Sequence, residues 1–312
     1  MMLSRAAERV YWTGRYLERA EGTARIAQQY SQLFLDLPPD VGAEWYDLVT
    51  IFGAMQAFAD SGRGRTENDI LQFLLAEEAG PSSLMYSLRA LRENVRNSRD
   101  LLPHESWENV NELYHVSREQ LALAAAGENR FEILSDCIGR CQQVYGILAA
   151  TMSHHSPYRF LVLGQNIERA DMTSRIIDVA AAYLREDERQ VLRYESTLWS
   201  NVLRSVSGFQ MYRQYCQPQV NGVGVVRFLL GDSAFPRAVQ CCLDAARDSA
   251  AALPAGEDVI AALAAANELV TGLDVEAMTA AEASALMDRL QAALGRAHEA
   301  VVARWFLPGD AA

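Results

Sequence analysis

The sequence predicts an all-α protein, a helical bundle of about twelve helices built from two pseudo-two-fold-related repeats of about six helices each. One reason is a motif at residues 14–26, GRYLERAEGTARI, which recurs without a gap at residues 164–176 as GQNIERADMTSRI. Another is that no useful length of sequence alternates between apolar and polar residues, as a half-buried strand would. We therefore expect a single domain over residues 1–312, with internal repeats of about 1–153 and 154–312.

The repeated motif carries a charged strip on an otherwise apolar helix. At about 100° per residue, Glu18, Glu21 and Arg25 fall on one strip, with Arg15 beside it. A helix that is apolar or small on its other faces is expected to be buried. Buried charges must be paired, so a structural network of Glu and Arg would explain these residue types. The alternative is a site in which Arg binds a carboxylate or phosphate and Glu handles an amine or a proton.

The second copy of the strip differs at one position. Gln165 stands where the first copy has Arg15, so the two halves are not expected to act equally. We expect Arg25 and its counterpart to be buried and paired with motif carboxylates, and we take the second copy as more structural than functional. The residues of that second strip are Glu168, Asp171 and Arg175.

Proline, glycine and capping residues divide the first half into helices. Pro38-Pro39 ends the motif helix, Asn68-Asp69 can cap a short helix, and Pro81-Ser82-Ser83 opens the next one, which Pro103 breaks. The expected helices up to the junction at residues 154–157 are 3–36, 45–58, 68–75, the helix that residues 81–83 open and Pro103 breaks, 105–126 and 131–152. The second half repeats this order: Phe228-Leu229-Leu230 follows Phe73-Leu74-Leu75 at an offset of 155, and its last helices are expected at 258–270 and 281–305.

A second group of polar residues occurs in the first half alone, where the second half is rich in Ala. We treat it as a candidate for catalysis or substrate binding. The alternative is a solvated helix face on which Glu93 and Asp100 balance the arginines. The candidate residues are Arg92, Asn94, Arg96, Arg99, Glu105 and Trp107.

Composition excludes several classes of function. The net charge is −12, which argues against a nucleic-acid partner. All 28 basic residues are Arg, so a Walker lysine and a Schiff-base lysine are excluded, and any bound anion would be held by guanidinium groups. We expect no cofactor on this chain.

Metal and membrane sites are not expected either. A di-metal carboxylate bundle needs two Glu-x-x-His motifs, and the chain has one, at Glu112–His115. The charged residues Arg5, Glu8 and Arg9 leave no apolar stretch for a signal peptide, and no apolar run approaches the roughly 18 residues of a membrane span. We expect a cytoplasmic protein with no membrane partner.

The order of motifs resembles the bacterial alpha-E family, an all-helical family. The resemblance covers nearly the whole chain, with differences at Gln165, where Arg is expected, and at Gly80, where Asn is expected. The motifs are MLSR at 2–5, YW at 11–12, GRYLERAE at 14–21, FLL at 73–75, PSS at 81–83, LRENVRNSR at 91–99, ESW at 105–107, IERADMTSRIID at 167–178, FLLGD at 228–232 and PR at 236–237.

The resemblance implies a role beside ATP-grasp amide-bond ligases and transglutaminase-like proteins. We therefore expect a component of peptide synthesis or modification that acts with a separate ATP-grasp ligase. It would bind an amino-acid or peptide substrate, or carry out a follow-on step, at the buried Glu/Arg strip. The alternative is a non-catalytic helical scaffold for such a ligase. The two differ in whether the strip lines a pocket or is sealed by side chains.

Overall fold

The computed structural model describes residues 4–38, 43–183, 189–216 and 218–307. These contain fourteen α-helices, two short π-helical segments and no strand, which confirms the all-α prediction. No described helix is both long and apolar enough to cross a membrane. The α-helices are α1 (Ser4–Asp36), α2 (Tyr46–Ile51), α3 (Met55–Asp60), α4 (Glu67–Leu71), α5 (Leu84–Arg96), α6 (His104–Ala125), α7 (Arg130–Thr151), α8 (Ser156–Tyr183), α9 (Arg189–Ser205), α10 (Phe209–Tyr215), α11 (Gly222–Gly231), α12 (Val239–Ala251), α13 (Glu257–Glu268) and α14 (Ala280–Val301), and the π-helical segments are Gln72–Ala76 and Val302–Phe306.

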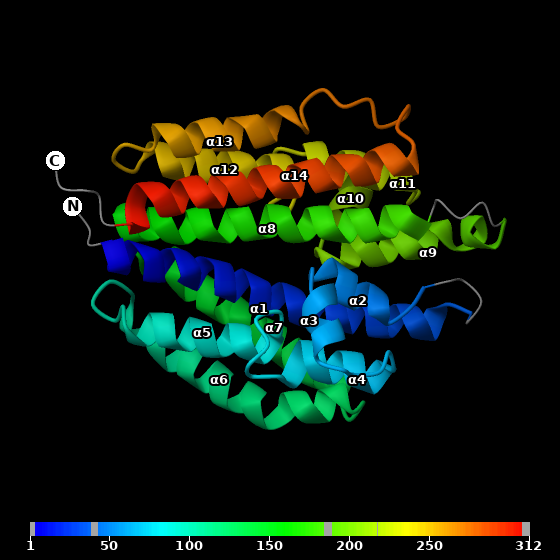
Figure 1. Ribbon diagram of the computed structural model, residues 1–312, viewed down its shortest axis with the longest axis horizontal. Coiled ribbons are helices and arrows are strands. Elements are labelled where there is room, and N and C mark those ends of the chain that lie inside the picture. The colour runs from blue at the N-terminus through cyan, green and yellow to red at the C-terminus, as the bar shows by residue number, and fades with distance from the viewer. Residues whose placement is uncertain (1–3, 39–42, 184–188, 217, 308–312) are drawn as a thin grey trace.

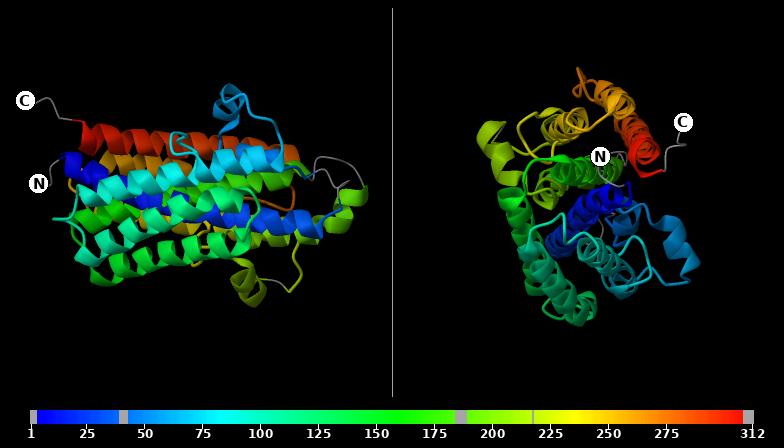
Figure 2. Two further views of the ribbon diagram at one scale, coloured as in Figure 1. Left: turned by 90° about the horizontal axis from the view of Figure 1, so that it is seen from below. Right: turned by 90° about the vertical axis from the view of Figure 1, so that its left-hand side faces the viewer.

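The two motif helices, α1 and α8, lie side by side at the centre of the molecule (Figure 1). Helix α1 packs on α5 and α7, and α6 closes that group into a four-helix arrangement (Figure 2). Helix α8 packs in the same order on α12 and α14, with α13 closing the second group. The contacts therefore follow the same order in both halves, while the superposition of one whole half on the other stays a prediction.

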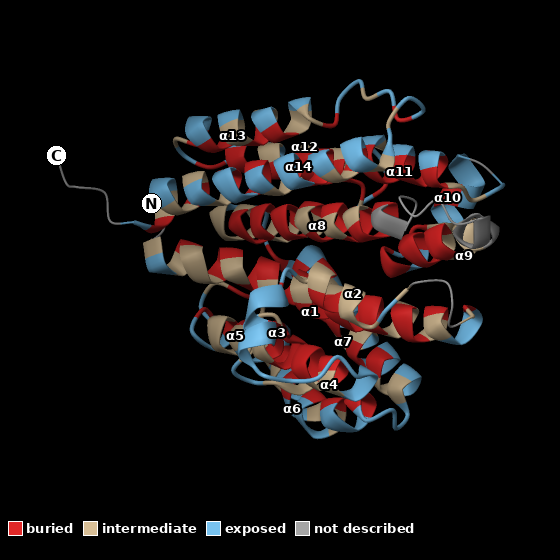
Figure 3. Cartoon of the chain, turned by 45° about the vertical axis from the view of Figure 1, so that its right-hand side comes forward, coloured by how far each residue is buried: buried red, intermediate tan, exposed pale blue. Residues whose placement is uncertain are grey.

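Burial follows from this central position. Red, which marks buried residues, runs along most of α1 and α8 in Figure 3. A glycine in each helix allows the two backbones to touch. A Cβ on Gly14 would lie 2.2 Å from the carbonyl oxygen of Leu161, and one on Gly164 would lie 2.2 Å from that of Tyr11. Because Tyr11 and Leu161 each precede a motif glycine by three residues, the two close contacts are reciprocal.

Several expected boundaries differ from the structure. The helix expected over 45–58 is split into α2 and α3 at Gly53, whose φ of +61° cannot continue a helix. The side chain of Thr66, rather than Asn68 or Asp69, caps α4 by accepting a hydrogen bond from the Asp69 amide. The split gives the first half seven α-helices instead of the expected six. Leu3 and Pro39, predicted as a helix start and stop, lie outside the described residues.

The next helix begins where the sequence predicts and ends earlier. Ser83 caps α5 by accepting a 3.0 Å hydrogen bond from the Tyr86 amide, which confirms the expected start. The helix ends at Arg96 and does not continue to Pro103, so Arg99 lies in the turns that follow the helix.

The glycine contact predicts the effect of adding one methyl group. Gly14→Ala should lower the free energy of unfolding by at least 1–3 kcal/mol, roughly the range for overpacking, because a backbone carbonyl cannot move aside as a side chain can. Gly146→Ala is the matched control, since Gly146 is an exposed residue of α7 with no heavy atom within 4 Å of an added Cβ. There, alanine should stabilise the protein by up to about 1 kcal/mol. Urea unfolding of both variants tests this, and equal effects would reject the close crossing.

Candidate functional site

The central feature of the site is a reciprocal pairing of the two motif copies. Arg169 of α8 donates from Nε to Glu18 of α1 at 2.6 Å. Arg19 of α1 donates from Nε to Glu168 of α8 at 2.5 Å. Each Glu-Arg dipeptide thus binds its counterpart across the helix crossing. The pairs lie about one helical turn beyond the contacting glycines, where the backbones are still close enough for the side chains to meet.

The Glu168 end of this pairing is closed. Arg19 donates to both carboxylate oxygens, with a second bond of 3.1 Å from its Nη2, and Arg15 adds a 2.6 Å bond from its Nε. The Glu168 side chain is 2% exposed. Burial would raise its pKa, but Arg19 and Arg15 outweigh burial and lower the pKa to about 2. Glu168 is therefore an ionised structural anchor at neutral pH.

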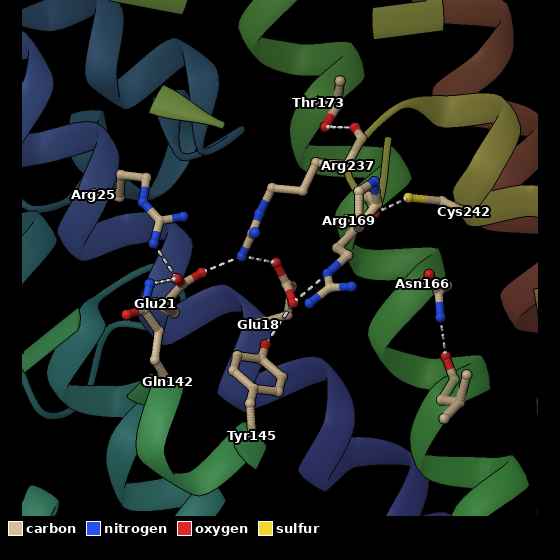
Figure 4. Close-up of polar contacts among 12 residues, drawn as sticks. Glu18, Glu21, Arg25, Gln142, Tyr145, Asn166, Arg169, Thr173, Arg237 and Cys242 are labelled. Carbon is tan, nitrogen blue, oxygen red and sulfur yellow. Dashed lines mark hydrogen bonds and ion pairs between the residues drawn. The ribbon is translucent and has the colours of Figure 1, made fainter. Parts of the chain in front are cut away.

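The Glu18 end has a different set of partners. Arg237, from the turn before α12, donates to Glu18 at 3.0 Å and to Glu21 at 2.5 Å (Figure 4). Tyr145 of α7 donates its hydroxyl proton to Glu18 at 2.5 Å. Burial opposes ionisation of Glu18, but Arg169 and Arg237 hold its pKa below the ordinary value. Burial and the nearby Glu18 charge raise the pKa of Tyr145, so this phenol stays protonated.

A pocket of about 370 Å³ opens beside the Glu18 end. Gln165, the counterpart of Arg15, lines it together with Glu21, Arg169 and Arg237. Glu18 lies behind these side chains and is 2% exposed. The charged strip is therefore partly sealed and partly open. The other lining residues are Gln142, Tyr145, Leu148, Ala149, Tyr158, Leu161 and Val162.

The buried network carries an excess of positive charge. Three carboxylates, those of Glu18, Glu21 and Glu168, are paired within the network. Five guanidinium groups surround them, which gives a formal charge of +2. The five residues are Arg15, Arg19, Arg25, Arg169 and Arg237. An anion entering the pocket would reduce this excess, and guanidinium groups are well suited to bind carboxylates or phosphates.

The strip residues that the sequence predicts differ from one another in burial and in their partners. Arg25 is buried and pairs with Glu21, as expected. Arg175 pairs with Asp171 at 2.9 Å, but its side chain is 30% exposed, so the prediction that it is buried is wrong. Arg15 contacts Glu168 across the crossing and is not among the residues that line the 370 Å³ pocket.

The second predicted group lies between α5 and α6, and no described hydrogen bond or ion pair joins it to the strip. Arg92 donates to Asn111 at 2.8 Å and stacks over Trp107, as does Arg99. Arg96 pairs with Glu93 at 2.8 Å. Asn94 is half-buried and Glu105 is exposed. This arrangement fits the alternative of a partly solvated face.

Sequence reasoning missed Arg237, Tyr145 and Gln142 as site residues. Arg237 was visible within the PR motif at 236–237, but nothing local showed that it reaches α1. Tyr145 and Gln142 are polar residues on α7 without a distinctive spacing, so only the packing of α7 on α1 identifies them. In the described part of the chain, no three His, Cys, Asp or Glu side chains converge as metal ligands.

Comparison with known families gives a match over most of the chain. The Alpha-E family, described as a predicted alpha-helical domain with a conserved ER motif, matches residues 2–306. The chain belongs to the Alpha-E family. In the structure, Glu18-Arg19 and Glu168-Arg169 are the two Glu-Arg dipeptides that bind each other across the crossing.

Two curated proteins are similar to this chain over part of their own length. They are the uncharacterised proteins Mb2597 of Mycobacterium bovis and MT2643 of Mycobacterium tuberculosis. Each is 23% identical over 265 residues, which is 78% of this chain and 29% of the relative. This Alpha-E chain thus matches less than a third of either protein. No solved structure matches the chain.

The closed end predicts a large loss of stability when its carboxylate is neutralised. Glu168→Gln should lower the free energy of unfolding by about 3–5 kcal/mol, because Arg15 is left buried without a counter-charge. The exposed pair of Glu276 and Arg227 gives the control. There, Glu276→Gln should cost less than about 1 kcal/mol. Chemical denaturation measures both variants, and comparable small losses would show that the Glu168 end is hydrated.

His298 predicts a pH dependence of stability. Its Nδ1 lies 2.9 Å from Tyr11 Oη, and burial together with the Arg15 charge lowers the pKa of His298 from 6.5 to about 4. Between pH 4 and pH 6.5 the unfolded chain binds a proton at His298 that the folded protein does not bind. The stability that follows from this difference is therefore complete above about pH 6.5 and is lost as the pH falls towards 4. His298→Gln should flatten the fall between pH 6.5 and 5, and His104→Gln, at an exposed site, should leave it unchanged. Urea titrations at several pH values measure this.

Proposed function

We propose that this Alpha-E protein is the substrate-binding component of a peptide-forming or peptide-modifying system, in which a separate ATP-grasp ligase supplies amide-bond formation. The observation that carries the proposal is the pocket at the Glu18 end. It combines Arg169 and Arg237, which can bind a carboxylate, with Glu21, which can accept a hydrogen bond from an amine. These are the two charged groups of an amino acid or of a peptide.

The volume and lining of the pocket support a small peptide-like ligand. About 370 Å³ lies within the range of sites for small molecules. Leu148 of α7 and Leu161 and Val162 of α8 give the pocket an apolar part of its lining, which can accommodate an aliphatic or aromatic side chain. The charged groups are already held in place by Glu18 and Tyr145 behind them. Binding would therefore need little rearrangement of the guanidinium groups, which favours affinity.

The partner follows from the family resemblance and the absence of Lys from the chain. An arginine-only chain has no Walker lysine for a nucleotide, so activation of a carboxylate is assigned to another protein. The longer mycobacterial relatives, in which the similar region makes up 29% of the sequence, support the idea that an Alpha-E domain works with additional domains. On the same family resemblance, we include a transglutaminase-like protein as a further member of such a system.

A pocket-filling substitution tests the proposal. Ala149 lines the pocket from the exposed side of α7, and Ala150 is its exposed neighbour outside the lining. In a mixture with an ATP-grasp ligase from the same organism, Mg-ATP and mixed amino acids, Ala149→Trp should reduce the ligated product about tenfold or more, whereas Ala150→Trp should not. Mass spectrometry of the products, with melting temperatures of both variants, gives the result.

The same experiment includes the scaffold alternative. If the protein only organises the ligase, omission of the chain should abolish the product while Ala149→Trp and Ala150→Trp both retain it. Full product yield from Ala149→Trp would therefore contradict a substrate-binding role for the pocket and favour the scaffold.

A further inference from the structure

A second pocket lies on the other side of Gln142. It has a volume of about 570 Å³ and is formed by α1, α7 and the junction of α9 with α10. Gln142 lines both pockets and donates a 3.4 Å hydrogen bond to Glu21. The two pockets are therefore neighbours, with the Gln142 side chain at their common boundary.

The second pocket is basic. Arg25 and Arg204 line it, accompanied by uncharged polar residues such as Gln28, Gln29 and Gln210. No Asp or Glu is among its described lining residues. Arg204 is exposed, stacks over Phe209 with its guanidinium carbon 4.9 Å from the ring centre, and has no ion-pair partner in the described chain. Its charge is therefore available to a ligand.

Arg25 adds an unsatisfied buried donor. It is 5% exposed, and its Nη2 donates to Glu21, while its Nη1 is buried and has no hydrogen-bond partner in the described structure. In Figure 4 this second amino group points away from Glu21. A buried donor without an acceptor is costly, and a bound oxyanion would supply the missing acceptor.

We propose that the pocket lined by Arg25 and Arg204 is an oxyanion-binding subsite, which takes a carboxylate or phosphate carried by the same ligand that occupies the first pocket. The identity of that ligand as an amino acid or peptide rests on the proposed function. The substrate class then narrows to peptides with a second anionic group, such as an acidic side chain or a phosphorylated residue. The Gln142 boundary places this group beside the Glu21 side of the first pocket.

The first test uses small anions. Inorganic phosphate and succinate are titrated by calorimetry into the parent protein, Arg204→Gln and Arg213→Gln. Arg213 is the matched control, because it is an exposed arginine over the same Phe209 ring but outside the pocket lining. Arg204→Gln should weaken anion binding about tenfold, as expected for the loss of a charge-assisted contact, and Arg213→Gln should leave it unchanged. Equal weakening by both variants, or no binding to the parent, would overturn the subsite.

The second test separates this subsite from the proposed function. The peptides Ala-Glu, Ala-phosphoserine and Ala-Gln are titrated into the same proteins and into Ala149→Trp. Ala-Glu or Ala-phosphoserine should bind the parent protein about tenfold more tightly than Ala-Gln does. Whichever of these two anionic peptides binds more tightly shows whether the subsite prefers a carboxylate or a phosphate. Arg204→Gln should abolish the preference for the anionic peptide over Ala-Gln. Equal binding of all three peptides to the parent would overturn the subsite and leave the peptide-binding function standing. If the small anions bind in a manner that depends on Arg204 but none of the peptides binds, the oxyanion subsite is supported and the proposal of a peptide ligand is contradicted.

Discussion

The close crossing of α1 and α8 is the constraint on which the rest of the structure depends. It exists because Gly14 and Gly164 present no Cβ where each backbone meets a carbonyl of the other helix. At that separation Glu18 reaches Arg169 and Arg19 reaches Glu168, so that each of two buried carboxylates is paired with a half-buried guanidinium group. Without such pairing, desolvation of these charges would oppose folding. The glycines therefore allow the close crossing, and the Glu-Arg dipeptides pair the charges that the crossing brings together.

The same crossing is completed differently at its two ends, and this difference produces the candidate site. At the Glu168 end, Arg15 comes from the adjacent turn of α1 and closes the contact. At the Glu18 end the equivalent position is Gln165, and the partners come from more distant elements. Arg237 donates to the Glu18 oxygen that Arg169 does not use, and Tyr145 shares the other oxygen with Arg169. Those longer-range partners leave space between α7 and α8, and the first pocket occupies it. A near-symmetric framework thus supports an asymmetric pocket.

Charge balance gives the pockets their chemical character. The network around the crossing holds more guanidinium groups than carboxylates, although the whole protein has a net charge of −12. Such a local excess attracts anions while the acidic surface elsewhere does not attract nucleic acid. Arg25 links the two pockets electrostatically, because it pairs with Glu21 on the side of the first and lines the second.

The sequence by itself determined the helical class, the central role of the repeated motif and the need to pair its charges. These follow from local periodicity and from the cost of burying ions, which the residues of one segment already specify. It could not determine that Glu18 pairs across the crossing, that Arg15 serves the other copy, or that Arg237 and Tyr145 complete the site. Nor could it show that the cluster around Arg92 stands apart from the strip. Only the tertiary structure decided these points, because the partners lie up to 219 residues apart and meet through helix packing that no local pattern encodes.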